Sequence, residues 1–502
     1  MIPEPKKMTT CEEKVHAGKL EIKSSKIEGL EKTAELVSTR LSGEKVLPIV
    51  IEKLDGDGEK YTLSVDESGV LIKATEKAVF DACSTLSALV KVDGEGTYFN
   101  LCEIEDEARF SHRGFMLDVA RHFQTIDTVK CVIDMLFKLK INVFHWHLSD
   151  DQGFRIALPG FERIAEHGSK RNCSYVGGFK KAHSDNTPHE GIYSVEEIRD
   201  VLEYAKIRGV KVIPEIDLPG HFSAVLSSHP EFTCDGKEFE VPGYYGILEN
   251  TLCLGNDEAR EFAKKLLLAV AKTFGTDVMH VGFDEIKTTK LKNCPKCQAR
   301  KKELGLDTER QLIEAFRKEV RNYLLENGVK IICWNDGLDE VDYKAVVQHW
   351  KPGTAKETAK RINAGQKMII SDFMHYYADY PYCMTPLRKT YDFDPIMKGV
   401  TEKQNVVGVE TPLWAEWVEG TDKIYFYACY RMAAVAETAW NETKRPYEEF
   451  IEDLRENDEY YFGKKLDIPE SILNPKGKFF KLISFMGSDW NKELDEWKSL
   501  KK

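Results

Sequence analysis

The sequence has no apolar run of membrane-spanning length and no excess of basic residues. It carries 71 Lys and Arg against 83 Asp and Glu, which gives a net charge of −12 at pH 7. This balance argues against nucleic acid or an anionic membrane as a partner. The first residues, 1–21, also lack the apolar core of a signal peptide. We therefore expect a cytoplasmic protein, or one from which a leader has been removed.

The twelve cysteines lack the paired spacing of a zinc-binding module. Only Cys294 and Cys297, in NCPKC, have the short gap typical of metal ligands, and no second pair with similar local spacing occurs. Five other cysteines lie in apolar segments, as reduced core thiols do: Cys102, Cys131, Cys253, Cys333 and Cys429. The spacing therefore predicts no structural metal site.

A chain of 502 residues is too long for one ordinary hydrophobic core. We expect residues 1–108 to form a small α+β domain and residues 109–502 to form a larger catalytic domain with a C-terminal helical extension. In the first domain, KVLPIVIEK, KYTLSV and GVLIKA have the composition of strands. The following TEKAVFDACSTLSALVKV has the apolar spacing of a helix.

From about Arg113 the sequence alternates between strand-like and helix-like segments. Eight segments have the character of buried strands: GFMLDVA, INVFHWHLS, VKVIPEID, DVMHVGF, VKIICW, AVVQHW, KMIIS and VVGVE. Two of the intervening helices begin with capping boxes, Ser194 with Glu197 and Thr308 with Gln311. Eight strands alternating with helices predict a (β/α)8 barrel, or TIM barrel, whose active site lies at the C-terminal ends of the strands.

Charged and aromatic side chains follow nearly every predicted strand, as an active barrel requires. They are Asp118, Arg121, His145, His147, Asp150, Asp151, Glu215, Asp217, Asp284, Glu285, Trp334, Asp336, Trp350, Trp414 and Glu416. A barrel without a function would not need charge at so many strand ends. We therefore predict one large site.

Two of three possible chemistries explain only part of this set. A metal hydrolase could use His145 and His147, with His221 and His280, as ligands. Amidohydrolase barrels, however, carry such a pair at the first strand, and histidines also serve as hydrogen-bonding partners of acids. A sugar-binding barrel without catalysis would use the tryptophans as stacking surfaces. It would have no need for Asp284 beside Glu285.

A glycoside hydrolase explains the adjacent carboxylates of HVGFDEI. Cleavage of a glycosidic bond needs a protonated carboxyl that donates to the leaving oxygen, and a second group that stabilises the oxocarbenium-like centre. Neighbouring carboxylates resist joint ionisation, so the two can take different protonation states. The two side chains can both reach a ligand because the backbone turns at the end of the strand.

Six motifs carry a resemblance to a known family: HRGFMLDVARHF, NVFHWHLSDDQGFRI, VIPEIDLPGH, HVGFDE, VVQHW and TPLWAEW. They resemble glycoside hydrolase family 20, the β-N-acetylhexosaminidases, and occur in order from about His112 to Trp440. The N-terminal segment more loosely resembles the small α/β domain that precedes the barrel in that family.

The resemblance implies roles for the residues around the scissile bond. Glu285 would be the general acid and later the general base. Asp284 would hold the N–H of the substrate's 2-acetamido group, whose carbonyl oxygen attacks the anomeric carbon and forms an oxazolinium ion. Tyr377 would donate to that carbonyl oxygen, with Tyr376 as an adjacent rival, and Asp379 would assist the same group.

The resemblance also implies a binding pocket for the sugar ring. Arg121 and Glu416 would bind ring hydroxyls, Trp334, Trp350 and Trp414 would wall the pocket, and Asp150 and His221 would support the acid. Asp336 would be a further hydroxyl contact, whereas Arg113, Asp118 and Asp217 would be scaffold. No metal or other cofactor is implied. The substrate would be an oligosaccharide or glycoconjugate with a terminal β-linked GlcNAc or GalNAc.

Overall fold

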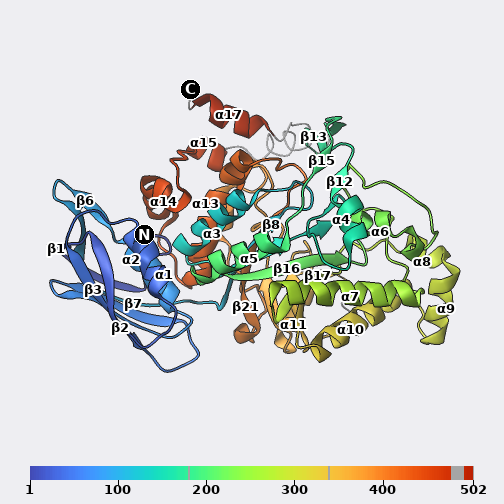
Figure 1. Ribbon diagram of the computed structural model, residues 1–502, viewed down its shortest axis with the longest axis horizontal. Coiled ribbons are helices and arrows are strands. Elements are labelled where there is room, and N and C mark those ends of the chain that lie inside the picture. Colours follow the sequence, from blue (N-terminus) through green and yellow to red (C-terminus); the bar gives the residue numbers. More distant parts are fainter. Residues whose placement is uncertain (179–180, 337–339, 476–490, 501–502) are drawn as a thin grey trace.

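An N-terminal seven-stranded sheet forms one end of the molecule (Figure 1). The computed structural model describes residues 1–178, 181–336, 340–475 and 491–500. The strands are β1 (Lys7–His16), β2 (Lys19–Ser25), β3 (Val46–Lys53), β4 (Lys60–Asp66), β5 (Gly69–Ala74), β6 (Lys91–Asp93) and β7 (Gly96–Glu107). Their order is β1-β7-β4-β5-β3-β2, with β6 paired to β7.

Three of these strands, β3, β4 and β5, and the helix α2 (Val79–Ala88) lie where the sequence predicted them. The sequence pattern did not indicate β1, because all but the last two of its residues are exposed and no buried face alternates along it. The helices α1 (Glu31–Ser38) and α2 lie between the sheet and the barrel (Figure 1), and α2 contacts α3 (Ile126–Lys138) of the barrel domain.

Eight parallel strands close into a barrel, which confirms the predicted (β/α)8 fold. The strands are β8 (His112–Asp118), β9 (Val143–His147), β16 (Lys211–Leu218), β17 (Val278–Gly282), β18 (Lys330–Trp334), β19 (Ala345–His349), β20 (Met368–Ile370) and β21 (Val406–Leu413). Near the end where the strands begin, the interior is closed by Val143, Ile213, Ile332 and Ile369. The polar side chains of the opposite end therefore rest on a packed floor.

Helices surround the barrel and connect its strands (Figure 1). Besides α3, the longer ones are α5 (Val195–Lys206), α7 (Asp257–Phe274), α10 (Glu309–Glu326), α11 (Ala355–Asn363) and α13 (Thr421–Trp440). Both predicted capping boxes are present, on α5 and α10. Shorter helices are α4 (Glu162–Gly168), α6 (Ser223–Ser228), α8 (Thr289–Asn293), α9 (Pro295–Glu303) and α12 (Leu387–Asp392).

The loop after β9 carries short strand pairs. They are β10 (Ser149–Asp150) with β11 (Gly153–Phe154), β12 (Lys170–Arg171) with β15 (His189–Glu190), and β13 (Tyr175–Val176) with β14 (His183–Ser184). The chain ends in α14 (Tyr447–Phe462), α15 (Glu470–Leu473) and α17 (Lys492–Leu500). In the part of the chain that the structure covers, none of the helices combines the length and the apolar character that crossing a membrane requires.

Buried ion pairs join the two domains. Arg113, at the start of the barrel, pairs with Glu59 and, at 3.2 Å, with Asp81 of the N-terminal domain. Lys140 Nζ lies 3.0 Å from Asp106 Oδ2 across the same junction. Buried pairs of this kind stabilise an interface only when both partners stay in place. They fix the sheet against the bottom of the barrel.

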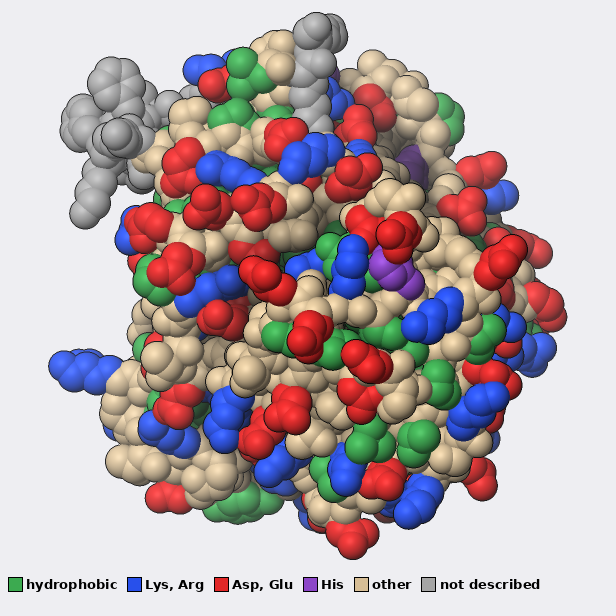
Figure 2. Space-filling model, turned by 90° about the vertical axis from the view of Figure 1, so that its left-hand side faces the viewer, with side chains coloured by type: hydrophobic (Ala, Val, Ile, Leu, Met, Phe, Trp, Pro, Cys, Tyr) green, Lys and Arg blue, Asp and Glu red, His purple; other side chains and the backbone are tan. Residues whose placement is uncertain are grey.

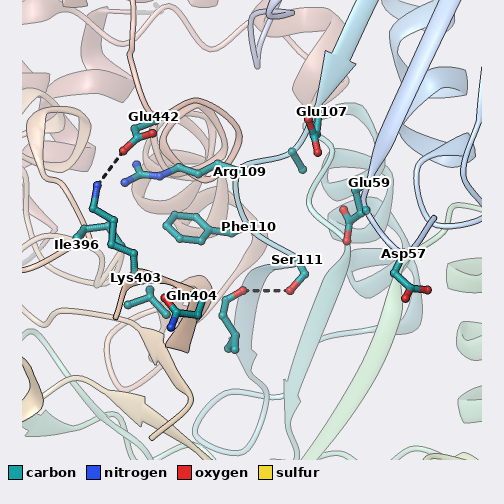
Figure 3. A pocket seen from close by; sticks show the side chains of 14 residues that line it. Asp57, Glu59, Glu107, Arg109, Phe110, Ser111, Ile396, Lys403, Gln404 and Glu442 are labelled. Atoms are coloured by element: carbon teal, nitrogen blue, oxygen red, sulfur yellow. Dashed lines mark hydrogen bonds and ion pairs between the residues drawn. The ribbon is translucent and has the colours of Figure 1, made fainter. Parts of the chain in front are cut away.

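A hollow of ≈ 440 Å³ opens beside this junction (Figure 3). Its wall includes the linker residues Arg109 and Ser111, and Lys403 pairs with Glu442 at 3.3 Å on its other side. The hollow lies at the end of the barrel where the strands begin. It is therefore separated by the whole barrel from the strand ends where catalysis is expected.

The outer face of the N-terminal domain is mixed in charge (Figure 2). Acidic and basic side chains are interspersed across the face shown, with a few apolar side chains between them. This arrangement is that of a solvated surface, and it matches the moderate net charge of the chain.

Candidate active site

The backbone after β17 turns sharply at the two adjacent carboxylates. Gly282, Phe283 and Glu285 all have positive φ angles, 65°, 69° and 48°. Such conformations cost free energy in residues other than glycine and collect at functional sites. At Gly282 a Cβ atom would come within 1.7 Å of Asp217 Oδ1, so only glycine fits. The turn lets both Asp284 and Glu285 face the same end of the barrel.

The two carboxylates occupy unlike environments. Asp284 is 7% exposed, and burial raises its pKa to about 7. Burial and the nearby Asp284 raise the pKa of Asp217 well above its usual value, so Asp217 keeps a proton. The side chain of Glu285 is 32% exposed and lines a cavity of ≈ 510 Å³ together with Ile247 and Trp350. One carboxyl is thus enclosed, and the other faces an open cavity.

A chain of charged side chains connects Glu285 to Arg121. His221 Nε2 lies 3.5 Å from Glu285 Oε2, and its Nδ1 lies 3.1 Å from Asp150 Oδ1. Arg121 Nη2 is 2.7 Å from Asp150 Oδ2, and its Nη1 is 3.1 Å from Asp118. Burial lowers the pKa of His221, but Asp150 outweighs burial and raises it well above the ordinary value. His221 is therefore an imidazolium at neutral pH.

Glu215 is the centre of a second buried network. Its Oε1 lies 2.6 Å from His280 Nδ1 and accepts a hydrogen bond from Trp334 Nε1 at 3.0 Å. Its Oε2 contacts His147 Nδ1 and lies 3.1 Å from His145 Nε2. These partners come from three barrel strands, β9, β17 and β18, so the carboxylate of Glu215, on β16, links four strands at the base of the site.

The same contacts argue against a metal ion at these histidines. Burial lowers the pKa of His145 and His147, but Glu410 and Glu215 outweigh it, and the values rise to about 9 and about 10. An imidazolium has no lone pair for a metal. His145, Glu215 and His280 lie close enough together to hold an ion, yet contacts of 3.1 Å from His145 and 2.6 Å from His280 already engage both oxygens of Glu215. Their geometry favours the role of partners of acids.

Four aromatic side chains, Trp334, Trp414, Tyr377 and Trp350, form a continuous row of neighbouring rings in the site. Ring centroids lie 5.7 Å apart for Trp334 and Trp414, 6.3 Å for Trp414 and Tyr377, and 6.4 Å for Tyr377 and Trp350. The nearby charge of Asp284 contributes to the raised pKa of Tyr377, after burial. Tyr376 is fully buried and packs edge-on against Phe393. Of the two neighbouring tyrosines, Tyr377 is therefore the one in the site.

Several buried polar atoms of the pocket have no hydrogen-bond partner among the described residues. They include Asp284 Oδ1, Asp379 Oδ1 and the hydroxyl of Tyr245. Burial, and next Glu416, raise the pKa of Asp379 well above its usual value. Unsatisfied buried groups are rare in proteins, and a ligand with several hydroxyl and N–H groups would satisfy them. Glu416 lies 4.0 Å from Arg121 at the edge of this group.

Asp336 supports a tryptophan. Its Oδ2 accepts a hydrogen bond from Trp350 Nε1 at 2.6 Å, and its Oδ1 lies 2.7 Å from Lys351 Nζ. Both oxygens are engaged, so Asp336 fixes the orientation of the Trp350 ring. A contact between Asp336 and a sugar hydroxyl stays a prediction.

The sequence pattern gave no role to Gln152, which contacts Arg121, or to Tyr245, which contacts Trp417. Gln152 Oε1 accepts from Arg121 Nε at 3.1 Å, and Gln152 Nε2 donates to the carbonyl of Tyr244 at 2.7 Å. Tyr245 lies beside Trp417, with 5.1 Å between ring centroids. Tyr244 and Tyr245 belong to the long irregular loop between α6 and α7, which has no periodicity that would reveal its path.

Residues 110–443 match the family model for the catalytic domain of glycosyl hydrolase family 20. The chain belongs to this family. It is therefore a glycoside hydrolase whose catalytic domain is the (β/α)8 barrel described above.

Curated relatives of this family are named β-hexosaminidases. The chain is 31% identical to the β-hexosaminidase of Porphyromonas gingivalis over 420 residues. This alignment covers 79% of this chain and 52% of the relative. The chain is 30% identical to the β-hexosaminidase of Akkermansia muciniphila over 373 residues. This alignment covers 71% of this chain and 74% of the relative. The chain thus spans about half the length of the first relative and about three quarters of the second.

Solved structures of the family share the fold. The exo-β-N-acetylglucosaminidase of Vibrio harveyi, in complex with N-acetylglucosamine, superposes with a TM-score of 0.80 at 25% identity, covering 91% of this chain and 76% of that one. The chitobiase of Flavobacterium johnsoniae gives a TM-score of 0.78 at 27% identity, with 92% and 72% covered. Both comparisons include the N-terminal region as well as the barrel.

Proposed function

We propose that this family 20 enzyme is an exo-acting β-N-acetylhexosaminidase. It would remove terminal β-linked GlcNAc or GalNAc from oligosaccharides or glycoconjugates, with retention of the anomeric configuration and with the substrate's own acetamido oxygen as nucleophile. The observation that carries the proposal is the pair Asp284 and Glu285, one enclosed with a pKa of about 7 and one open to a cavity. The names of the relatives support the same activity.

In the first step, the enclosed carboxylate orients the nucleophile. Asp284 Oδ1, unpartnered among the described residues, accepts the acetamido N–H, and Tyr377 donates to the acetamido oxygen. That oxygen forms a bond to the anomeric carbon while the bond to the leaving oxygen breaks. The positive charge of the oxazolinium ion then lies beside the Asp284 carboxylate, in a site of low dielectric where such attraction is strong.

Glu285 moves the protons of both steps. It donates its proton to the leaving oxygen, and it later accepts a proton from the water that opens the oxazolinium ion. His221, 3.5 Å away, holds the Glu285 side chain toward the cavity. The tryptophans Trp334, Trp350 and Trp414 would exclude water from the acetamido methyl and cover a face of the sugar.

The ring hydroxyls would meet charged groups on the opposite side of the pocket. Arg121 is held by Asp118 and Asp150, and Glu416 lies 4.0 Å from it. A held guanidinium has lost its rotational freedom before the substrate arrives, so each hydrogen bond to a hydroxyl costs less entropy. Asp379, which lies near Tyr377, would assist the acetamido group instead.

A rate panel over aryl β-glycosides tests the proposed activity. We expect high kcat/KM for the glycosides of GlcNAc and GalNAc and almost no hydrolysis of the glucoside, because glucose lacks the acetamido nucleophile. The measurement is release of the same aryl leaving group from each sugar at one pH. Comparable rates for the glucoside and the GlcNAc glycoside would overturn the proposal.

Replacing His221 with asparagine is expected to move the acid limb of the pH profile to higher pH. The imidazolium of His221 lowers the pKa of Asp284, which burial raises to about 7 overall. Asp284 acts as a carboxylate, so activity is lost as pH falls through that pKa. Removing the neighbouring cation should raise the limb by roughly one pH unit or more.

Asparagine suits this position because His221 has a φ of 46°, which asparagine tolerates. The measurement is log kcat/KM against pH for the wild type and the His221→Asn variant. An unchanged acid limb with a uniformly lower rate would show that His221 only positions the acid and does not set the ionisation of Asp284.

A further inference from the structure

Four cysteines that are far apart in the sequence meet in the structure. Cys234 and Cys253 belong to the long loop between α6 and α7, whereas Cys294 and Cys297 flank the start of α9. We call these four residues the four-cysteine cluster. They lie near α8 and α9, at the end of the molecule opposite the N-terminal domain (Figure 1). Local spacing in the sequence does not reveal the pair Cys234 and Cys253, because a whole loop separates its two members.

The distances between the sulfur atoms are those of a tetrahedral metal site. Sγ atoms lie 3.8 Å apart for Cys234 and Cys297, 3.7 Å for Cys253 and Cys294, and 3.7 Å for Cys253 and Cys297. All four lie within 4.8 Å of one another. An ion bonded to four sulfurs at about 2.3 Å would place neighbouring sulfurs about 3.8 Å apart. A disulfide would need about 2.0 Å.

The cluster is enclosed by protein. Cys253, Cys294 and Cys297 are 1%, 3% and 0% exposed, and Cys234 is half-buried. Four thiols that converge in an apolar setting are poor partners for one another, because S–H groups are weak donors and acceptors.

The backbone brings the two cysteine pairs together through tight local contacts. Thr233 and Leu252 form an antiparallel bridge, and the N–H of Cys253 donates to the carbonyl of Phe232 at 2.8 Å. A Cβ atom on Gly255 would come within 2.1 Å of the backbone of Lys296. The loop and the start of α9 therefore pack backbone to backbone, and only glycine allows this approach.

We propose that the four-cysteine cluster binds one structural Zn²⁺ ion through four thiolates. Binding displaces the thiol protons into solvent, so affinity rises with pH. Four protein ligands fill a tetrahedral shell and leave no position for water or substrate, which makes the ion structural and not catalytic. The proposal is independent of the hydrolytic activity assigned to Asp284 and Glu285.

The ion would tie together two walls of the active site. Residues 235–252 lie between the ligands Cys234 and Cys253, and this loop provides Ile247 to the cavity of Glu285. Tyr244 of the same loop accepts the hydrogen bond from Gln152, which in turn accepts from Arg121. On the other side, Cys294 follows the segment 286–288, which lines the same cavity. Loss of the ion should loosen the loop first.

Metal analysis of the full-length protein tests the proposal. We expect about one zinc per chain by inductively coupled plasma mass spectrometry after purification without added metal. Titration of the cysteines with a mercurial should release that zinc to a colorimetric chelator. Substitution by Co²⁺ should give the intense visible bands of a tetrahedral cobalt–thiolate site. Less than about a tenth of a zinc per chain, iron in its place, or two disulfides by mass spectrometry would overturn the proposal.

Variants separate the cluster from other buried thiols. Cys294→Ser combined with Cys297→Ser should abolish zinc binding and lower the melting temperature. The matched control is Cys102→Ser, a buried cysteine of the N-terminal sheet, which should keep one zinc per chain. Retention of zinc by the double variant would contradict the assignment. If that variant fails to fold, the zinc release and cobalt spectrum of the wild type still decide the question.

Discussion

Glu285→Gln is expected to lower kcat/KM for natural oligosaccharides by about 10²- to 10⁴-fold, the range that a positioned general acid contributes. The amide keeps the shape of the side chain but has no proton to give to the leaving oxygen. Aryl glycosides with very good leaving groups need less protonation, so their bond-breaking step should suffer less. The measurement is kcat/KM for both substrate classes in the wild type and the variant.

A matched control lies at the rim of the same cavity. Glu249 is exposed and faces Lys287 at 3.6 Å, so Glu249→Gln should leave both rates nearly unchanged. An equal and small loss for both substrate classes in Glu285→Gln would identify another residue as the acid.

The barrel was predictable because its strands are buried on both faces and read as continuous apolar segments. Each of the eight predicted segments overlaps an observed strand, although β8, β16 and β21 extend beyond the segments predicted for them. The capping boxes on α5 and α10 were also local signals and are present as predicted. By contrast, β1 is nearly fully exposed, so its pairing with β7 depends on tertiary contacts that no local pattern records.

The sequence likewise predicted the positions of some residues of the candidate site and not of others. The strand-end rule found Asp284, Glu285 and Arg121, because parallel strands place their C-terminal ends together. It could not find that both oxygens of Asp336 are engaged by Trp350 and Lys351. Cys234, Cys253 and Tyr245 lie in an irregular loop, where spacing in the sequence does not report distance in space. Cys253, interpreted from the sequence as a core thiol, is buried but belongs to that cluster.

Asp284→Asn is expected to reduce kcat/KM for β-GlcNAc substrates by about 10²- to 10³-fold, as loss of a preorganised electrostatic partner does. The carboxylate faces the positive oxazolinium ion, and the amide cannot neutralise it. Because the pKa of Asp284 is raised to about 7, the carboxylate is formed above that pH and lost below it. The ratio of wild-type to variant activity should therefore shrink as the pH falls from 8 to 5.

The control for this variant is Asp277→Asn at the other end of β17. Asp277 pairs with Lys211 at 2.7 Å on the surface, and its replacement should leave activity nearly unchanged at every pH. A wild-type to variant ratio for Asp284 that does not depend on pH would show that Asp284 has another ionisation state than the one assigned to it.

Substrates fluorinated on the acetyl methyl test most directly whether the substrate supplies the nucleophile. Fluorine withdraws electrons from the carbonyl oxygen, so kcat/KM for the aryl β-glycosides should fall steadily along the mono-, di- and trifluoro series. The binding contacts of the sugar ring stay the same, which leaves the basicity of the oxygen as the variable. A steady decline without any covalent adduct on Asp284 or Glu285 is the predicted result. A flat series, or a trapped glycosyl ester on either carboxylate, would contradict the account.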